Sequence, residues 1–91
     1  GEVFVPNIFS PNNDGNNDVF YVRGKCIEKM QWVIYNRWGA KVFESDSPQN
    51  GWDGSYKGKN LDAAVFVWHL KYKLSIDTEE KTMKGNITLV K

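Results

Sequence analysis

The sequence has few of the residues that build covalent scaffolds and metal centres. It contains one cysteine and one histidine, and no long hydrophobic run. The single cysteine, Cys26, cannot form a disulfide within the chain, and we expect it to be a small buried apolar residue. Metal-dependent catalysis needs more His, Cys or Glu ligands than the chain supplies. No apolar run approaches the roughly 18 residues that span a bilayer. These shortages argue against a disulfide scaffold, a metalloenzyme and a membrane-spanning helix.

The chain also lacks an excess of charge and a helical period. Its net charge is +1, with 12 basic and 11 acidic residues scattered along it, which argues against a nucleic-acid partner. It is rich in aromatic residues instead, at 14% with 4 Trp among 91 residues. We expect one small domain that buries about 60–65% of its unfolded surface around large aromatic side chains.

The chain is organised around a predicted hairpin. Met30–Tyr35 and Lys41–Glu44 are apolar runs that flank the segment Asn36–Gly39, which is typical of an antiparallel hairpin. Gly39 can adopt the left-handed backbone conformation that such a turn requires. Arg37 and Trp38 are unusual in a turn, so the Trp38 ring must either fold over the core or stand exposed for a partner.

Other alternating or β-rich runs predict the remaining strands. Ala63–Ile76 has apolar residues at every second position, and Gly85 in the following run predicts a bulge or a close backbone contact. Turn formers separate these runs, so we predict an all-β sandwich of six or seven strands. The expected strands outside the hairpin are Glu2–Val5, Val19–Val22, Ala63–Ile76 and Lys81–Val90.

The Asn- and Asp-rich loop Ser10–Asp18 is the first candidate site. It partly matches a calcium loop, with oxygen ligands at alternate positions before Gly15, but position 21 is Tyr where the closing Glu would stand. We favour a structural loop that is tied by its own side chains, with a weak calcium site as the alternative. The ligands of that site would be Ser10, Asn12, Asp14 and Asp18.

The tryptophans and the histidine form the second set of candidates. Trp32 and Trp68 have core parity in predicted strands, whereas Trp38 and Trp52 lie in loops and could form a sugar-stacking platform. Trp52, which precedes Asp53-Gly54, is expected to be an aromatic plug over a turn. His69 has no linked nucleophile and is expected to be an ordinary cross-strand residue, so we predict no enzyme.

Four lysines allow two interpretations. They fit the charged protection of a sheet edge as well as a binding patch. These residues are Lys71, Lys73, Lys81 and Lys84.

Five motifs in order resemble a known family, the gliding-motility-associated C-terminal domain. This is the type B sorting domain of the type IX secretion system in Bacteroidota, and the resemblance extends from Val5 to Lys91. At the start of the long strand the family has Gly, then Val or Ile, then Tyr, whereas this chain has Ala64-Val65-Phe66. The motifs are Phe9–Phe20, Tyr35–Gly39, Val42–Glu44, Trp52–Lys59 and Lys84–Lys91.

The resemblance implies a fold and a role. It implies an Ig-like antiparallel β-sandwich, a single domain over residues 1–91, excised from a larger secreted protein; the chain begins Gly-Glu-Val without Met. The domain would direct an N-terminal passenger from the periplasm through the outer-membrane translocon to the cell surface or medium. Expected partners are translocon components and an outer-membrane protein of the PorP/SprF group. We expect a monomer with no cofactor, with a weakly bound calcium ion as the alternative. The resemblance also implies a difference from type A signals, which are removed and replaced by a lipopolysaccharide anchor.

A signal without catalytic groups must act through its displayed shape. We hypothesise that the Asn36–Gly39 turn, the Asn12–Asp18 loop and the last strand meet the translocon. Arg37 and Trp38 would stack as a cation–π pair worth roughly 0.5–2 kcal/mol, and the last strand would be captured by β-augmentation. The hypothetical recognition residues are Asn36, Arg37, Trp38, Gly39, Lys84, Gly85, Thr88, Leu89, Val90 and Lys91.

Three alternatives stay open at this point. In the first, the motifs only hold the fold together. A carbohydrate-binding module would use Trp38 and Trp52, and an adhesin-type Ig domain would space or bind its neighbours.

Overall fold

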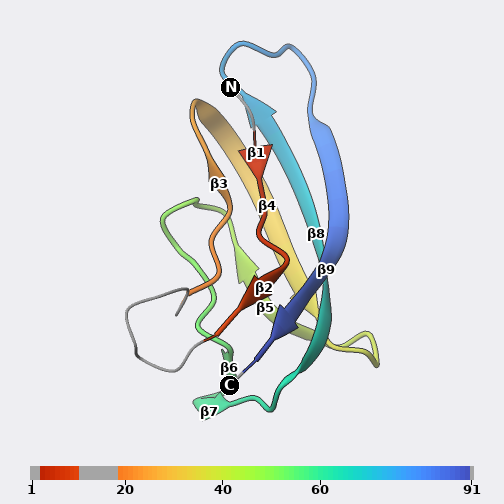
Figure 1. The fold of residues 1–91 in the computed structure, drawn as a ribbon. Helices are drawn as coiled ribbons and strands as arrows, with labels where there is room; N and C mark the ends of the chain where they lie inside the picture. The colour runs from red at the N-terminus through yellow and green to blue at the C-terminus, as the bar shows by residue number, and fades with distance from the viewer. Residues whose placement is uncertain (1–2, 11–18, 91) are drawn as a thin grey trace.

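The structure, a computed structural model, describes residues 3–10 and 19–90, and these residues form strands and loops without a helix (Figure 1). The prediction of an all-β sandwich is confirmed, and the described strands number nine. Five of the nine are only two residues long. The strands are β1 (Val3–Phe4), β2 (Ile8–Phe9), β3 (Arg23–Gly24), β4 (Ile27–Tyr35), β5 (Lys41–Ser45), β6 (Ser55–Tyr56), β7 (Lys59–Asn60), β8 (Ala64–Leu74) and β9 (Lys81–Leu89).

One five-stranded sheet in the order β2-β9-β8-β4-β5 carries the fold. β8 lies at its centre and pairs antiparallel with both β4 and β9, while β2 pairs parallel with β9 (Figure 1). The predicted long strands are therefore confirmed to within two residues at their ends, except that β4 begins at Ile27, three residues before the predicted start at Met30. The parallel β2 departs from the purely antiparallel pairing that we expected.

The alternation of β8 decides which face of this sheet is buried. Trp68 lies opposite Ile34 of β4, and Leu70 lies opposite Trp32. Side chains at this parity are buried, and Trp32 is fully enclosed at 0% exposure. The predicted core positions of Trp32 and Trp68 are confirmed. The buried residues of the three long strands are Met30, Trp32, Ile34, Phe66, Trp68, Leu70, Leu74, Ile87 and Leu89.

The layer over this face is built from loops and two-residue strands. β1 pairs with β3, β6 pairs with β7, and Phe20 forms an isolated bridge with Trp52. The Phe9 ring stacks on Phe20 at 5.5 Å between ring centroids, and Trp52 meets Phe66 edge to face at 5.0 Å. Aromatic packing therefore closes the core where a continuous second sheet is absent from the described residues.

The predicted strand Val19–Val22 is wrong in its extent. In that segment only Phe20 bridges to another segment, and the next strand is β3. Phe20 and Val22 are both buried, so this segment is fixed by side-chain packing and by the bridge more than by a long ladder.

Gly85 allows a close contact with the ring of Trp68. The pairing of β8 with β9 shows no register shift, so there is no bulge in that ladder. A Cβ atom on Gly85 would lie 2.8 Å from Cζ2 of Trp68. The Trp68 indole also donates a hydrogen bond from Nε1 to the backbone oxygen of Asn86, at 3.3 Å. Of the two roles that we predicted for Gly85, the close backbone contact is the one observed.

The expectation that Cys26 is buried is wrong. Cys26 is exposed and has a φ of +61°. Its carbonyl oxygen accepts a hydrogen bond from the Ser75 amide at 2.8 Å. Cys26 therefore forms a sharp turn before β4, and its carbonyl links this turn to the end of β8. The residue is exposed to solvent in this conformation.

Edge protection also does not explain Lys71 and Lys73, because β8 is the central strand. The Lys73 ammonium donates a hydrogen bond to the Glu28 carboxylate, and Lys71 lies 3.7 Å from Glu80. The hydrogen bond from Lys73, its positive charge and the charge of Lys29 lower the pKa of Glu28 below its ordinary value, although desolvation opposes them.

Substitution of Gly85 tests the close contact with Trp68. We expect Gly85→Ala to lower the free energy of unfolding by about 1–3 kcal/mol, because the new methyl group must displace a buried indole. Asn86→Ala, on the exposed side of the same strand, should change it by less than about 0.5 kcal/mol. Urea denaturation measures both, and equal stability of the two variants would contradict the contact.

The Glu28–Lys73 pair predicts a pH dependence. Because the pKa of Glu28 is lowered in the folded state, the pair stabilises the fold above the unfolded-state value and loses this effect as pH falls through the folded-state value. Lys73→Met should raise the pKa of Glu28 towards its ordinary value of 4.5. Carboxyl carbon shifts across an acid titration measure this. Lys71→Met, which faces Glu80, is the control and should leave Glu28 unchanged.

Candidate functional site

The turn between β4 and β5 is held by one side chain. Asn36 Oδ1 accepts hydrogen bonds from the amides of Trp38 at 3.0 Å and Ala40 at 2.9 Å. The Asn36 carbonyl accepts from the Gly39 amide at 3.0 Å, and Gly39 has a φ of +84°. The predicted left-handed conformation of Gly39 is therefore confirmed. These bonds make the turn a defined support for the two residues at its tip.

Those two residues are displayed to solvent. Trp38 is 76% exposed, so of the two predicted alternatives the ring stands away from the core. Cζ of Arg37 lies 4.3 Å from the centroid of the Trp38 ring, which confirms the predicted cation–π pair. The pair lies on the turn between β4 and β5, which extends from the end of the sheet (Figure 1). A flat aromatic ring capped by a guanidinium is thus available for contact.

A groove of about 290 Å³ runs beside this turn. Its lining includes Tyr56, which is 37% exposed, and Val65, which is 50% exposed. Arg37 and Asp62 add charges of opposite sign to the same lining. The arrangement suits one apolar side chain of a partner with polar groups around it. Sequence reasoning missed Tyr56 as a site residue, although it lies inside the recognised motif Trp52–Lys59.

The departure from the family pattern at Ala64-Val65-Phe66 is accommodated here. Ala64 begins β8, pairs with Leu89 and lines the groove. Phe66 is buried with its ring against Trp52, so the missing tyrosine hydroxyl leaves an apolar contact in place.

Most of the predicted site residues in the last strand hold the fold, and one is exposed to solvent. Gly85 packs on Trp68, and Leu89 is fully buried. Thr88 and Val90 donate their amides to the carbonyls of Asn7 and Phe9, each at 3.0 Å.

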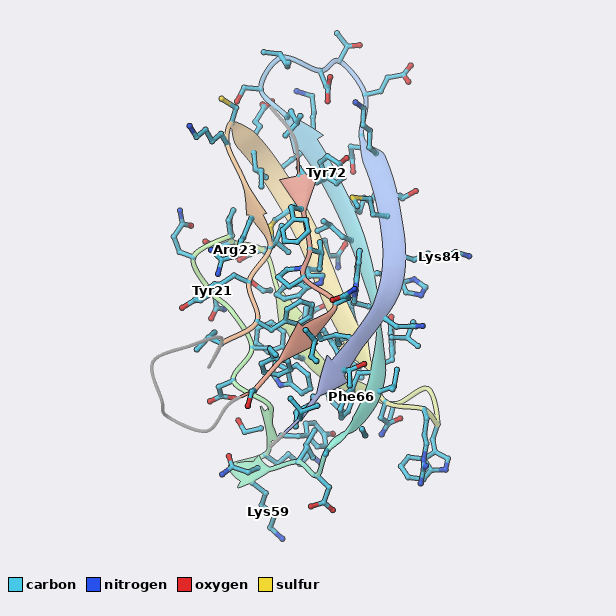
Figure 2. The ribbon with its side chains drawn as sticks, in the orientation of Figure 1. Tyr21, Arg23, Lys59, Phe66, Tyr72 and Lys84 are labelled. Carbon is cyan, nitrogen blue, oxygen red and sulfur yellow. The ribbon has the colours of Figure 1, made fainter. Side chains whose placement is uncertain are left out.

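Lys84 is exposed, and Figure 2 shows its side chain pointing away from β9. Lys91 lies outside the described residues. In the strand order of the sheet, β4 lies two strands away from β9. The predicted site residues of the β4–β5 turn and those of the last strand therefore do not form one cluster. Because Ile87 and Leu89 are in the core, truncation of residues 84–91 would damage the fold together with any signal.

Trp52 is enclosed and cannot serve as a sugar platform. It is 1% exposed, and its Nε1 donates a hydrogen bond to the Ser55 carbonyl at 2.9 Å. The Asp53 carboxylate accepts from the Ser55 amide at 3.0 Å. The predicted aromatic plug over this turn is confirmed.

The remaining candidates show no reaction centre. His69 is exposed and meets Tyr35 edge to face at 5.5 Å, as expected for a cross-strand residue. Within residues 3–10 and 19–90, no group of three His, Cys, Asp or Glu side chains is placed to hold a metal ion. Of the calcium-loop residues, Ser10 is half-buried, whereas Asn12, Asp14 and Asp18 lie outside the described residues, so calcium binding stays a prediction. The described chain also has no helix that would cross a membrane.

Substitution of Asn36 tests the support of the turn. We expect Asn36→Ala to lower the free energy of unfolding by about 1 kcal/mol, because two amides lose their acceptor in an exposed site. Asn36→Asp keeps the acceptor oxygen and should restore most of the loss, and Asn50→Ala serves as a surface control. Chemical denaturation measures all three. If Asn36→Ala and Asn36→Asp were equally stable, the side-chain acceptor would not support the turn.

Comparison with known proteins identifies one family for this chain. The family described as the CHU_C type IX secretion signal domain matches residues 3–89. No curated protein and no solved structure matches the chain significantly. The family match includes the displayed turn, the plug and all of β9. The chain therefore belongs to the type IX secretion signal domain family.

Proposed function

We propose that this domain directs an attached passenger through the outer-membrane translocon of the type IX system to the cell surface or the medium. Membership in the secretion signal family supports the role of an address, and that family is not known for catalysis. A signal of this kind is recognised by its surface, so the question becomes which surface is displayed.

The observation that carries the proposal is the exposed Trp38 on a hydrogen-bonded turn. Burial of a tryptophan is favourable, so a ring that is 76% exposed on a rigid support leaves a large apolar surface available to a partner. Tryptophan and arginine are enriched among the residues that dominate binding energy at interfaces. The Arg37–Trp38 pair and the adjoining groove together offer a ring, a cation and an apolar recess to the translocon.

The position of the turn fits an address at the end of a fusion. β1 lies towards one end of the sheet, and the β4–β5 turn lies towards the other (Figure 1). A passenger that precedes Val3 would thus join the domain away from Trp38 and leave the turn accessible. We propose an outer-membrane protein of the PorP/SprF group as the partner that reads it.

The carbohydrate-binding alternative loses its main support. Trp38 and Trp52 suggested a stacking platform, and the burial of Trp52 leaves only Trp38 of these two accessible. Nothing in the described surface favours an adhesin over a secretion signal.

Export of a reporter tests the proposal. Residues 1–91 are fused to the C-terminus of a fluorescent protein that carries a signal peptide, and the fusion is expressed in a bacterium with type IX secretion, with and without the translocon. We expect fluorescence at the surface or in the medium only when the translocon is intact. Retention in the periplasm of both strains would contradict the proposal.

Substitution in the same fusion tests the turn. We expect Trp38→Ala to lower export by about tenfold, which corresponds to roughly 1.4 kcal/mol of lost binding free energy. Arg37→Ala should lower it less, because the ring remains. Ile76→Ala is the matched control, since Ile76 is 75% exposed but follows β8, away from the β4–β5 turn. Equal export of the Trp38 and Ile76 variants, both folded, would show that the turn is not read.

A further inference from the structure

The outer edge of β9 is only partly covered. Thr88 and Val90 donate their amides to β2, on the side of β9 that faces away from β8. Backbone groups of alternate residues point to the same side of a strand, so Thr82, Lys84 and Asn86 present theirs to this side as well. β2 pairs only with Thr88 and Leu89, and no backbone group of a described residue hydrogen-bonds to Thr82, Lys84 or Asn86 on this side. The Asn86 carbonyl is already occupied, because it accepts the hydrogen bond from the Trp68 indole. The edge Thr82–Asn86 is therefore open apart from the Asn86 carbonyl, and Figure 1 shows β8 beside this part of β9 but no strand on its other side.

This edge lacks most of the usual protection against strand addition. Natural edges carry lysines, prolines, bulges or inward charges, and of these β9 has lysines. Here residues 81–90 contain no proline, and β9 keeps an unbroken register with β8. Lys81 is engaged by Asp77 at 3.4 Å, which leaves Lys84 as the exposed cation on the open edge. A regular edge of this kind is a template for an extended segment.

We propose that the edge Thr82–Asn86 accepts an extended acidic segment of the secretion machinery, which adds a strand beside β9 beyond the end of β2. This inference rests on the proposed function and names the chemistry of a second contact with the same machinery. The main-chain hydrogen bonds of the added strand provide affinity, and the side chain opposite Lys84 provides specificity.

Charge complementarity identifies the occupant as acidic. Lys84 forms no salt bridge with any described residue, and its side chain points away from the sheet (Figure 2). A residue directly opposite on an added strand would have its Cβ about 4.5–5.5 Å away, where Asp or Glu is favoured. A second copy of the chain fits poorly. The antiparallel register that pairs all of Thr82–Asn86 with itself would place Lys84 opposite Lys84, and like charges there are destabilising.

A proline at position 84 separates edge pairing from the rest of the fold. Lys84→Pro removes the outward amide but keeps the ladder to β8, because Met83 and Gly85 are the residues whose backbone groups point to β8. Proline is tolerated at an edge strand when its N–H side faces solvent. In the reporter fusion we expect export to fall more than tenfold, while the isolated domain stays folded by circular dichroism. Lys84→Ala, which keeps the amide and loses the charge, should fall about threefold.

Charge reversal provides a second test that does not require a proline. Lys84→Glu should lower export about tenfold, whereas Lys25→Glu makes the same change of net charge at an exposed residue before β4 and should export normally. If Lys84→Pro fails to fold, the comparison of Lys84→Glu with Lys25→Glu tests the edge proposal instead. Equal export of the two glutamate variants would overturn the acidic occupant.

The outcomes separate this inference from the proposed function. Normal export of folded Lys84→Pro, beside normal export of the unaltered fusion, would overturn the edge proposal alone. Retention of the unaltered fusion would contradict the proposed function, and the edge proposal with it. Light scattering of the purified domain supplies a further check. A dimer that Lys84→Pro dissociates would assign the edge to a second copy and overturn the proposed partner.

Discussion

The contact on which the rest of the structure depends is the burial of Trp52 against the inner face of the sheet. Its backbone bridges to Phe20 with hydrogen bonds of 2.7 and 2.9 Å, and its ring meets Phe9 and Phe66 at 5.4 and 5.0 Å. Aromatic pairs in these geometries add to the stabilisation from buried area. A loop residue thereby does what a second regular sheet does in larger sandwiches, and a chain of 91 residues closes its core with very short strands.

Because short strands and Trp52 close the core, surfaces at the ends and at one edge of the sheet stay exposed. The turn at Asn36–Gly39 satisfies its own backbone groups, so Arg37 and Trp38 are not needed for the core. Side chains of the last strand alternate between core positions, such as Leu89, and the solvent-exposed face of the sheet, where Lys84 lies. One strand can therefore hold the fold and carry recognition, because successive side chains point to opposite faces.

Much of the site was accessible to sequence reasoning where its causes are local. Asn36 and Gly39 set their turn through bonds within five residues, so the hairpin and the cation–π pair followed from the motif. The groove did not, because it joins Tyr56 and Val65 to the turn across separate segments. The same limit explains Cys26. Cysteine is usually buried, so its residue type suggested burial. Its carbonyl instead accepts a hydrogen bond from the Ser75 amide in a turn before β4, and the residue is exposed.

The sequence by itself determined the all-β class, the long strands and the family, because period-two alternation and ordered motifs are properties of the chain read locally. Only the tertiary structure decided that Trp52 is enclosed while Trp38 is exposed, although both are loop tryptophans near glycine. It also decided that β2 pairs parallel with β9 and leaves the outward amides of Thr82–Asn86 without a described backbone partner. Burial and strand order depend on contacts between distant segments, and local pattern does not specify which segments meet.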